Sequence, residues 1–184
     1  MNIKVLEKTK GCMPEIIKEG DWIDLKTARK IELKAPAVEG EGFSTALIPL
    51  GIAMKLPKGY EAHMLPRSST FKKYGIIMTN SQGIIDNSYC GNDDEWKFPA
   101  MAFKEIVIPK GTRIAQFRIV LSQKATIWQK IKHMFSSRIK LQKVESLSWN
   151  NRGGFGSTGD TAYTTKAGTK TKGKKGTPQG KKNK

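Results

Sequence analysis

Residues 80–91 read Asn-Ser-Gln-Gly-Ile-Ile-Asp-Asn-Ser-Tyr-Cys-Gly, and the fold of the chain can be worked out from this stretch outward. Two β-branched residues lead into Asp86, and glycines stand on either side at Gly83 and Gly91. This pattern predicts a strand, a turn and a second strand, with one carboxylate at the bend. An aspartate at such a bend commonly satisfies its own backbone as an Asx-turn, which is the simplest interpretation of the stretch taken alone.

The sequence around this hairpin consists of short apolar runs separated by Gly and Pro. The candidate strands are residues 3–6, 22–25, 29–33, 43–49, 51–56, 60–65, 76–79, 98–103, 105–108 and 113–120, with a last one at 138–144. One short helical turn is expected over residues 68–74. Many short strands with little helical period predict an all-β fold, either a barrel or a jelly roll.

Residues 122–137 interrupt this rhythm with a helical period. The apolar residues recur at helical spacing, at Ile127, Trp128, Ile131, Met134 and Phe135. Thr126 stands where an N-cap would begin the helix, which predicts a short inserted amphipathic helix. We expect its apolar stripe to pack on its own domain rather than to bind a partner.

The charge of the chain is uneven and separates a tail from the rest. The 184 residues carry a formal net charge of +17, and residues 160–184 contain eight lysines and one acid. A segment of Lys, Gly, Thr and Pro cannot bury enough apolar area to order itself. We therefore expect a β domain over residues 1–149, a glycine-rich arm over 150–159 and a disordered basic tail over 160–184. The tail is either a solubilising extension or a nonspecific arm for nucleic acid.

Cysteine and histidine usage gives no sign of a transition-metal site. Cys12 and Cys90 form no metal-like spacing, and the only two histidines are His63 and His133. This predicts two ordinary thiols in a reducing compartment. The chain also shows no leader-like start and no long apolar run, so a cytoplasmic protein without membrane contact is expected.

Several segments have the residues that a nucleoside triphosphate requires. Pro66-Arg67-Ser68-Ser69 places a guanidinium and two hydroxyls at the start of a helical turn, where they can donate to phosphate oxygens. Taken alone, this tetrapeptide could equally be a capping serine beside a surface arginine. Gln116, in Arg113-Ile114-Ala115-Gln116, is a polar group on a predicted strand.

The arm has a similar composition and an equally plain alternative. Its glycines allow close approach to a ligand, Arg152, Ser157 and Thr158 can donate to phosphate, and Phe155 offers a flat face to a base. A flexible linker would explain the glycines but not the other residues. Asp24 supplies a second carboxylate that could hold waters of a Mg²⁺ ion bound to substrate phosphates, although a solvated edge-strand acid has the same pattern.

Taken together and in order, these segments resemble the trimeric dUTP diphosphatase (dUTPase) family. The resemblance covers residues 3–159 and rests on five motifs: Asp24-Leu25, Pro66-Arg67-Ser68, Gly83 to Gly91, Arg113 to Gln116, and Arg152 to Gly159. The versions in this chain look most like a phage-type branch. The resemblance implies a jelly-roll homotrimer with each site shared between three subunits, in which the arm comes from a third chain.

The resemblance also implies what each residue does. Asp86 would be the general base that activates water for attack at the α-phosphorus of dUTP, with Mg²⁺ as cofactor and Asp24 as its ligand through water. The implied substrate-binding residues are Arg67, Ser68, Ser69, Asn80, Gly83, Ile85, Tyr89, Gln116, Arg152, Phe155, Gly156, Ser157 and Thr158. Uracil would pair with the main chain of the hairpin, and Tyr89 would exclude a ribose. The product dUMP would supply thymidylate synthesis.

Some features depart from the family pattern and leave alternatives open. The arm is two residues shorter than usual between Arg152 and Phe155, and Ser69 replaces a commoner glycine. Asp93, Asp94 and Glu95 are expected to lie in a solvated loop. A dCTP deaminase of the same fold would need a glutamate over the base, for which Glu95 is the candidate. A regulatory or nucleic-acid-associated binding protein with a retained nucleotide pocket is the other alternative.

Overall fold

A computed structural model describes residues 1–18, 20–34, 44–135, 138–147 and 151–154. The strands are β1 (Asn2–Glu7), β2 (Glu15–Ile16), β3 (Ile23–Lys26), β4 (Ile31–Leu33), β5 (Ser44–Pro49), β6 (Ile52–Lys55), β7 (Tyr60–Pro66), β8 (Ile76–Met78), β9 (Gly83–Asp86), β10 (Lys97–Ala102), β11 (Ile106–Ile108), β12 (Arg113–Leu121) and β13 (Lys140–Val144). The helices are α1 (Thr70–Tyr74) and α2 (Ile127–Met134).

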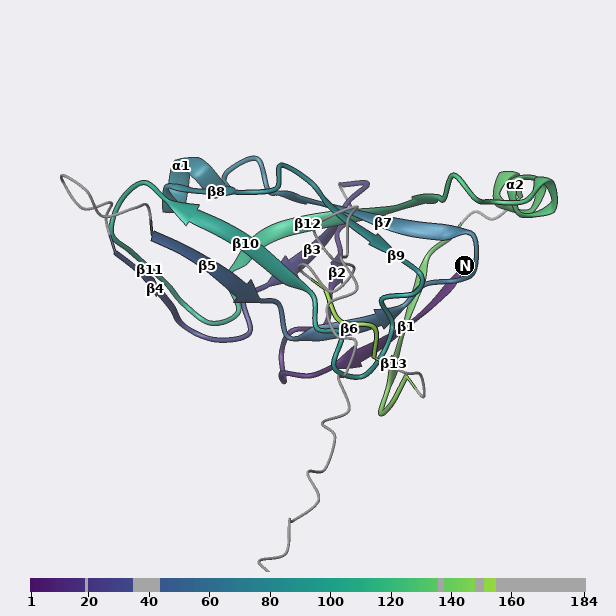
Figure 1. The fold of residues 1–184 in the computed structure, drawn as a ribbon, viewed down its shortest axis with the longest axis horizontal. Helices are drawn as coiled ribbons and strands as arrows, with labels where there is room; N and C mark the ends of the chain where they lie inside the picture. Colours follow the sequence, from purple (N-terminus) through teal and green to yellow (C-terminus); the bar gives the residue numbers. More distant parts are fainter. Residues whose placement is uncertain (19, 35–43, 136–137, 148–150, 155–184) are drawn as a thin grey trace, which may run out of the picture.

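The protein is all-β, as the sequence predicted, and every candidate strand is confirmed to within about two residues. The strands form four sheets with the orders β13-β1-β6, β5-β10-β8, β11-β4 and β2-β3-β12-β7-β9. Figure 1 shows these sheets wrapped around one interior. The described residues form a jelly roll of separate sheets rather than one closed barrel.

One core lies between the sheets and fixes their positions. The largest fully buried side chains include Trp96, Phe98 and Phe117, and the rings of Trp96 and Phe117 meet edge to face with centroids 5.1 Å apart. Phe117 belongs to β12, the central strand of the five-stranded sheet. The core therefore anchors the five-stranded sheet, which carries Asp24, Gln116 and Asp86. Cys12 and Cys90 are buried free thiols.

The predicted hairpin at residues 80–91 is half right. β9 forms and pairs with β7, but the residues after Asp86 turn into a loop that runs to Trp96, and no second strand follows directly. The reason is local, because side-chain carboxylates take the backbone N–H groups that a strand would use. Asp86 accepts from Ser88 N and Asp94 accepts from Gly91 N, both at 2.8 Å. We call this segment the 86–96 loop.

The inserted helix is confirmed, but the expected packing of its apolar stripe on its own domain is wrong. Thr126 caps α2 in a capping box with Gln129. Gln129 and His133 face the domain, where Gln129 donates to Lys58 O at 3.0 Å and the His133 ring lies 5.6 Å from that of Tyr60. The apolar stripe points to solvent instead, and its residues are exposed: Ile127, Trp128, Ile131, Met134 and Phe135. In Figure 1, α2 projects from one end of the long axis.

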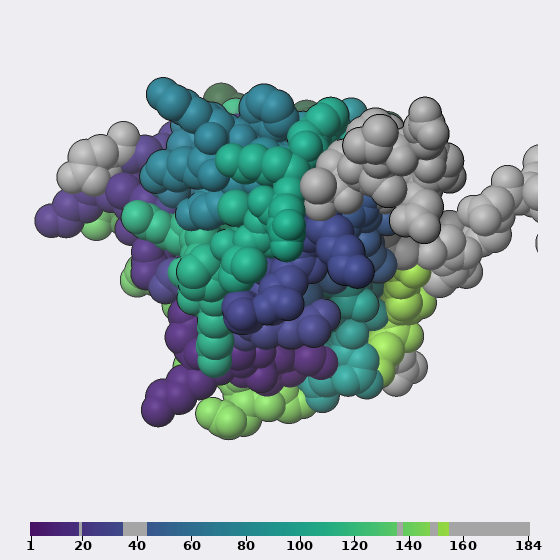
Figure 2. All heavy atoms as spheres, turned by 90° about the vertical axis from the view of Figure 1, so that its left-hand side faces the viewer, coloured from purple at the N-terminus to yellow at the C-terminus, as the bar shows by residue number. Residues whose placement is uncertain are grey.

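The opposite end of the molecule carries a smaller apolar surface. Phe71 of α1 and Phe103, which follows β10, are 57% and 46% exposed and meet edge to face at 5.9 Å. Figure 2 looks onto this end, where the α1 segment and the β10–β11 segment lie side by side at the surface. Neither α1 nor α2 has the length and apolar character that crossing a membrane would need.

Candidate active site

Asp86 is the last residue of β9, and its carboxylate faces two groups of donors. Oδ1 accepts hydrogen bonds from the backbone N and the Oγ of Ser88, at 2.8 Å and 2.5 Å. Oδ2 lies 3.0 Å from Nη1 of Arg152. The Asx-turn interpretation is therefore confirmed, and the same carboxylate also forms an ion pair that a turn does not require. Its side chain is 45% exposed, so water and a ligand can reach it.

The surroundings of Asp86 keep it ionised. Partial burial raises the pKa of its carboxyl, but the two hydrogen bonds from Ser88 and the charge of Arg152 outweigh this effect. The net pKa of Asp86 lies below its ordinary value. At neutral pH the group is thus a carboxylate that can accept a proton, which is the state that a general base needs.

The other residues predicted around Asp86 lie on β9 and in its flanking turns. Gly83 is buried, and a Cβ there would lie 3.0 Å from Cε of Met64 on β7, so a side chain would require the flexible end of Met64 to shift. Ile85 and Tyr89 pack against the core as partly buried residues. Asn80 is exposed in the turn before β9.

Tyr89 is held in place by the loop itself. Its hydroxyl donates to the backbone O of Glu95 at 2.9 Å. Burial, followed by the nearby charges of Asp94 and Glu95, raises the pKa of the Tyr89 phenol, so it stays a donor. A pocket of about 440 Å³ opens next to this region, with Ile84, Asp86 and Ser88 on one side and Thr126 of the α2 cap on the other.

The second group of candidate residues surrounds Asp24, on β3. The carboxylate is buried between two guanidinium groups, with Oδ1 2.9 Å from Nε of Arg67 and Oδ2 3.3 Å from Nη1 of Arg113. Gln116 stands opposite Asp24 in the β3–β12 register and donates to Pro66 O at 3.3 Å. Asp24, Arg67 and Gln116, which lie far apart in sequence, thus form one cluster.

The start of α1 brings the two serines to the same cluster. Thr70 Oγ1 and Arg67 N both donate to Ile114 O, at 2.7 Å and 3.2 Å, which fixes α1 to β12. Ser69 is the N-cap residue but accepts no capping hydrogen bond with its side chain, and Ser68 is exposed. Both serines therefore stand at the helix start, directly after Arg67 in the chain.

The geometry around Asp24 is compatible with a cation held chiefly by its ligand. The described residues contain no group of three or more His, Cys, Asp or Glu side chains that could hold a metal ion. Asp24 Oδ2 is buried and accepts no hydrogen bond within the described part of the chain. One buried carboxylate oxygen with spare acceptor capacity suits a water on Mg²⁺, whose direct ligands are commonly substrate phosphates.

The two groups lie far apart within one chain. Asp24 is opposite Gln116, which is opposite Leu65, whereas Asp86 is opposite Glu61 on the same strand β7. Asp24 and Asp86 are therefore three strands apart across the sheet and four residues apart along it. Together these offsets correspond to about 20 Å between the two residues. In the site that the family resemblance implies, one nucleoside triphosphate contacts both groups, whereas within one chain this separation keeps them apart.

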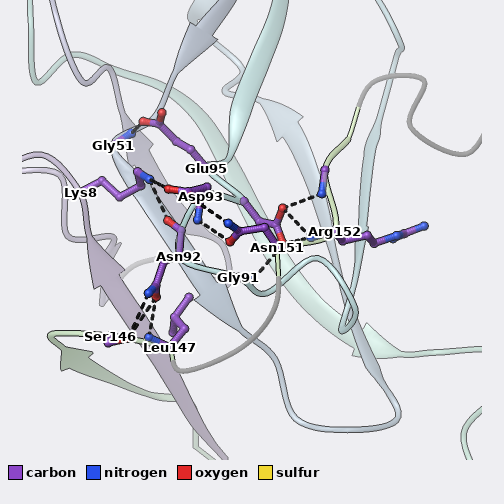
Figure 3. A network of polar contacts seen from close by, with 12 residues as sticks. Lys8, Gly51, Gly91, Asn92, Asp93, Glu95, Ser146, Leu147, Asn151 and Arg152 are labelled. Atoms are coloured by element: carbon purple, nitrogen blue, oxygen red, sulfur yellow. Dashed lines mark hydrogen bonds and ion pairs between the residues drawn. The ribbon is translucent and has the colours of Figure 1, made fainter.

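The root of the arm, residues 151–154, lies on the 86–96 loop of the same chain (Figure 3). Asp94 accepts hydrogen bonds from the backbone N atoms of Arg152 and Gly153, at 3.0 Å and 2.9 Å. Asn151 exchanges two hydrogen bonds with Asp93, at 2.6 Å and 2.9 Å. Phe155, Gly156, Ser157 and Thr158 lie outside the described residues, as does the tail at 160–184.

The expectation of a solvated loop at Asp93, Asp94 and Glu95 is wrong for two of the three acids. Asp94 is 1% exposed, and Glu95 Oε1 accepts from Gly51 N at 2.9 Å. Asp94 is the residue that sequence reasoning missed, because nothing in a run of acids shows which one is buried. The engagement of Glu95 with Gly51 also leaves it poorly placed for the deaminase chemistry considered above.

The chain matches known proteins over most of its length. The family model for dUTPase matches residues 23–159. The SPbeta prophage-derived deoxyuridine 5'-triphosphate nucleotidohydrolase YosS of Bacillus subtilis (strain 168) is 43% identical over 159 residues, covering 86% of this chain and 97% of that protein. The deoxyuridine 5'-triphosphate nucleotidohydrolase of Rickettsia rickettsii (strain Sheila Smith) is 34% identical over 162 residues, covering 86% and 96%.

Solved structures share the fold. The dUTPase from Streptococcus mutans superposes with a TM-score of 0.56 at 21% identity, covering 66% of this chain and 95% of its own. A mutant of the dUTPase from phage phi11 of S. aureus, described for its coordination of a structural Mg(II) ion, gives a TM-score of 0.55 at 18% identity, covering 68% and 94%. With the family model and both curated relatives in agreement, this chain belongs to the dUTPase family.

Proposed function

We propose that this chain hydrolyses dUTP to dUMP and pyrophosphate. The observation that carries the proposal is the ionised, accessible carboxylate of Asp86, held at the end of β9 by Ser88 and facing the Arg152 guanidinium. The names of the relatives agree with the same reaction. In this reaction Asp86 takes a proton from a water molecule, which attacks the α-phosphorus while pyrophosphate leaves.

The remaining candidate residues divide between base recognition and phosphate binding. Gly83 and Ile85 present main-chain groups to uracil, and Tyr89 packs under the deoxyribose, as the resemblance implies. Arg67, Ser68 and Ser69 donate to phosphate oxygens. The Arg152 guanidinium lies 3.0 Å from Asp86 Oδ2, and the triphosphate would compete for it, which would free Asp86 Oδ2 for the water.

Magnesium fits the phosphate side of this site. Asp24 would hold it through water, and the ion would neutralise charge on the triphosphate as pyrophosphate leaves. Support comes from the buried Asp24 Oδ2 and, for the choice of metal, from the structural Mg(II) ion described for the mutant dUTPase of phage phi11. Arg67 and Arg113 order the Asp24 carboxylate and supply fixed positive charge at the same place.

A homotrimer would bring the two groups of residues together. The support is their separation of about 20 Å within one chain, which an assembly of several chains would close. A cytoplasmic location and nonspecific nucleic-acid binding through residues 160–184 remain predictions from the sequence.

The test is pyrophosphate release from dUTP, dCTP, dTTP and UTP, each with Mg²⁺ and with EDTA. We expect release from dUTP alone, and only with Mg²⁺. Release from dUTP that is equally fast in EDTA would remove Mg²⁺ from the proposal. No release from dUTP with Mg²⁺ would refute the proposed function itself.

A further inference from the structure

The segment that leads into α2 forms one wall of the pocket beside Asp86. The opposite wall comes from β9 and the residues that follow it. The pocket-lining residues of the segment before α2 and of its first turn are Ser122, Gln123, Lys124, Thr126 and Gln129. None of them belongs to the five motifs that carry the resemblance to the dUTPase family. The pocket therefore has a wall that the family motifs do not account for.

This wall is fixed to the turn between β6 and β7. Ser122 N donates to Gly59 O at 2.9 Å, and Gln129 Nε2 donates to Lys58 O at 3.0 Å. Gly59 has a φ of +86°, which favours glycine, and the Gln129 side chain occupies the space that a Cβ there would take. Because β7 starts at Tyr60 and pairs with β9, the wall keeps a fixed position relative to β9.

Lys124 lies in a tight turn at the start of this wall. Ala125 N donates to Ser122 O at 2.9 Å, and Lys124 N donates to Ser122 Oγ at 3.3 Å. Ala125 is buried, whereas Lys124 is exposed and lines the pocket. Residues 106–144 contain no Asp or Glu, so no neighbour in sequence neutralises its charge. The backbone that carries Lys124 is thus fixed, while its flexible side chain can adjust to a ligand in the pocket.

The charges of the pocket suit an anion at this wall. Four charged side chains among the described residues line the pocket, namely those of Lys58, Glu61, Asp86 and Lys124. Glu61 is already engaged, because its Oε1 lies 3.0 Å from Nε2 of His63. Neither lysine forms an ion pair within the described part of the chain. The two lysines are therefore the positive groups that an anion beside Asp86 would meet.

We propose that Lys124 is a further substrate-binding residue, which contacts the α-phosphate of dUTP beside Asp86. As general base, Asp86 must lie within about 3 Å of the attacking water, and the water within about 3.5 Å of the α-phosphorus. The α-phosphate thus comes within about 7 Å of the Asp86 carboxylate, which lines the same pocket as Lys124. An ammonium group there stabilises the charge on the phosphate oxygens. This inference rests on the proposed function.

A binding experiment tests the contact without using hydrolysis. Two ligands are compared by NMR titration: a nonhydrolysable dUTP analogue, and deoxyuridine, which has no phosphate. Lys124→Gln removes the charge, so affinity for the analogue should fall about tenfold while affinity for deoxyuridine stays the same. Lys124→Arg should keep most of the affinity for the analogue. An equal loss for both ligands, or no loss for the analogue, would overturn the proposed contact.

Hydrolysis rates supply a matched control for charge. Lys130 is also exposed, on α2, and it lies outside the set of described residues that line the pocket. At one salt concentration, kcat/KM for dUTP should fall about tenfold in Lys124→Gln and change by less than about twofold in Lys130→Gln. Equal losses in the two variants would assign the effect to overall charge and overturn the proposed contact.

Two further outcomes separate this inference from the proposed function. Wild-type protein that neither binds the analogue nor hydrolyses dUTP would refute the proposed function itself. An active wild-type protein with a loss in Lys58→Gln but none in Lys124→Gln would assign the phosphate contact to the turn between β6 and β7. That result would overturn the role of Lys124 and leave the proposed function in place.

Discussion

At the scale of single residues, the Asp86 carboxylate makes both a turn contact and an ion pair, so the Asx-turn does not exclude the proposed role as general base. One oxygen forms the Asx-turn with Ser88, and the other faces Arg152. The turn fixes the direction of the carboxylate, which leaves Oδ2 as the oxygen that can receive a proton. The turn contact is therefore compatible with the proposed role of Asp86 as general base.

Replacing Asp86 by Asn should separate chemistry from binding. Asn keeps the size of the side chain but cannot accept the proton, so turnover should fall by about a hundred- to ten-thousand-fold. Binding of a nonhydrolysable dUTP analogue, measured by calorimetry, should persist. Asp21→Asn, an exposed acid outside both groups, should leave turnover unchanged. Full turnover by the Asp86 variant would exclude it as the general base.

The pH dependence of kcat/KM should report the hydrogen bonds to Asp86. The pKa of Asp86 is lowered, so the base stays ionised below the ordinary range of an aspartate and the rate falls only as the pH drops through that lowered pKa. Ser88→Ala removes the hydroxyl donor, which should move the acid limb of the profile to higher pH. An acid limb that does not move would mean that another group limits the rate.

The burial of Asp94 could not be predicted from the sequence. The type and position of Asp86, Arg67 and Gln116 could be predicted because each belongs to a motif with its own spacing. Asp94 stands in a run of three acids, and the donors Arg152 N and Gly153 N that contact its buried carboxylate come more than fifty positions later. A contact over that distance leaves no periodic signal, so only the structure could separate Asp94 from Asp93.

At the scale of elements, the strands were predictable and the loops were not. Short apolar runs bounded by Gly and Pro predicted ten strands before β13, since strands that line the core need apolar side chains. β2 was missed because it is two residues long. The second half of the hairpin failed because side-chain carboxylates captured its N–H groups. For α2, the helical spacing of the apolar residues predicted the helix, and Thr126 its cap. That spacing could not show which face of the helix packs on the domain.

The orientation of α2 leads to a prediction about stability. Trp128 and Phe135 are 76% and 83% exposed, so the double variant Trp128→Glu, Phe135→Glu should change the free energy of unfolding by less than about 1 kcal/mol. Phe117→Ala, in the core, should cost about 3–5 kcal/mol in the same denaturant titration. A loss comparable to the core variant would show that the α2 stripe is buried in solution.

At the scale of the whole molecule, the proposed homotrimer is what would bring the two groups of candidate residues together. The sequence supplied the members of both groups, and the sheet register shows that about 20 Å separates them. Which chain contributes which group could not be derived from one sequence, because no local pattern encodes the arrangement of copies.

The basic tail should be separable from catalysis at this scale. Residues 160–184 carry seven of the seventeen net positive charges and no member of the five motifs. Their deletion should leave dUTP hydrolysis unchanged and weaken binding to a single-stranded oligonucleotide, with a shallower dependence of affinity on salt because fewer counterions are released. Binding would be followed by fluorescence anisotropy at several salt concentrations. A full-length variant with all eight tail lysines replaced by Ser is the matched control, and it should behave like the deletion. Loss of hydrolysis in both variants would place the tail in the site, and unchanged affinity in both would exclude it as a nucleic-acid contact.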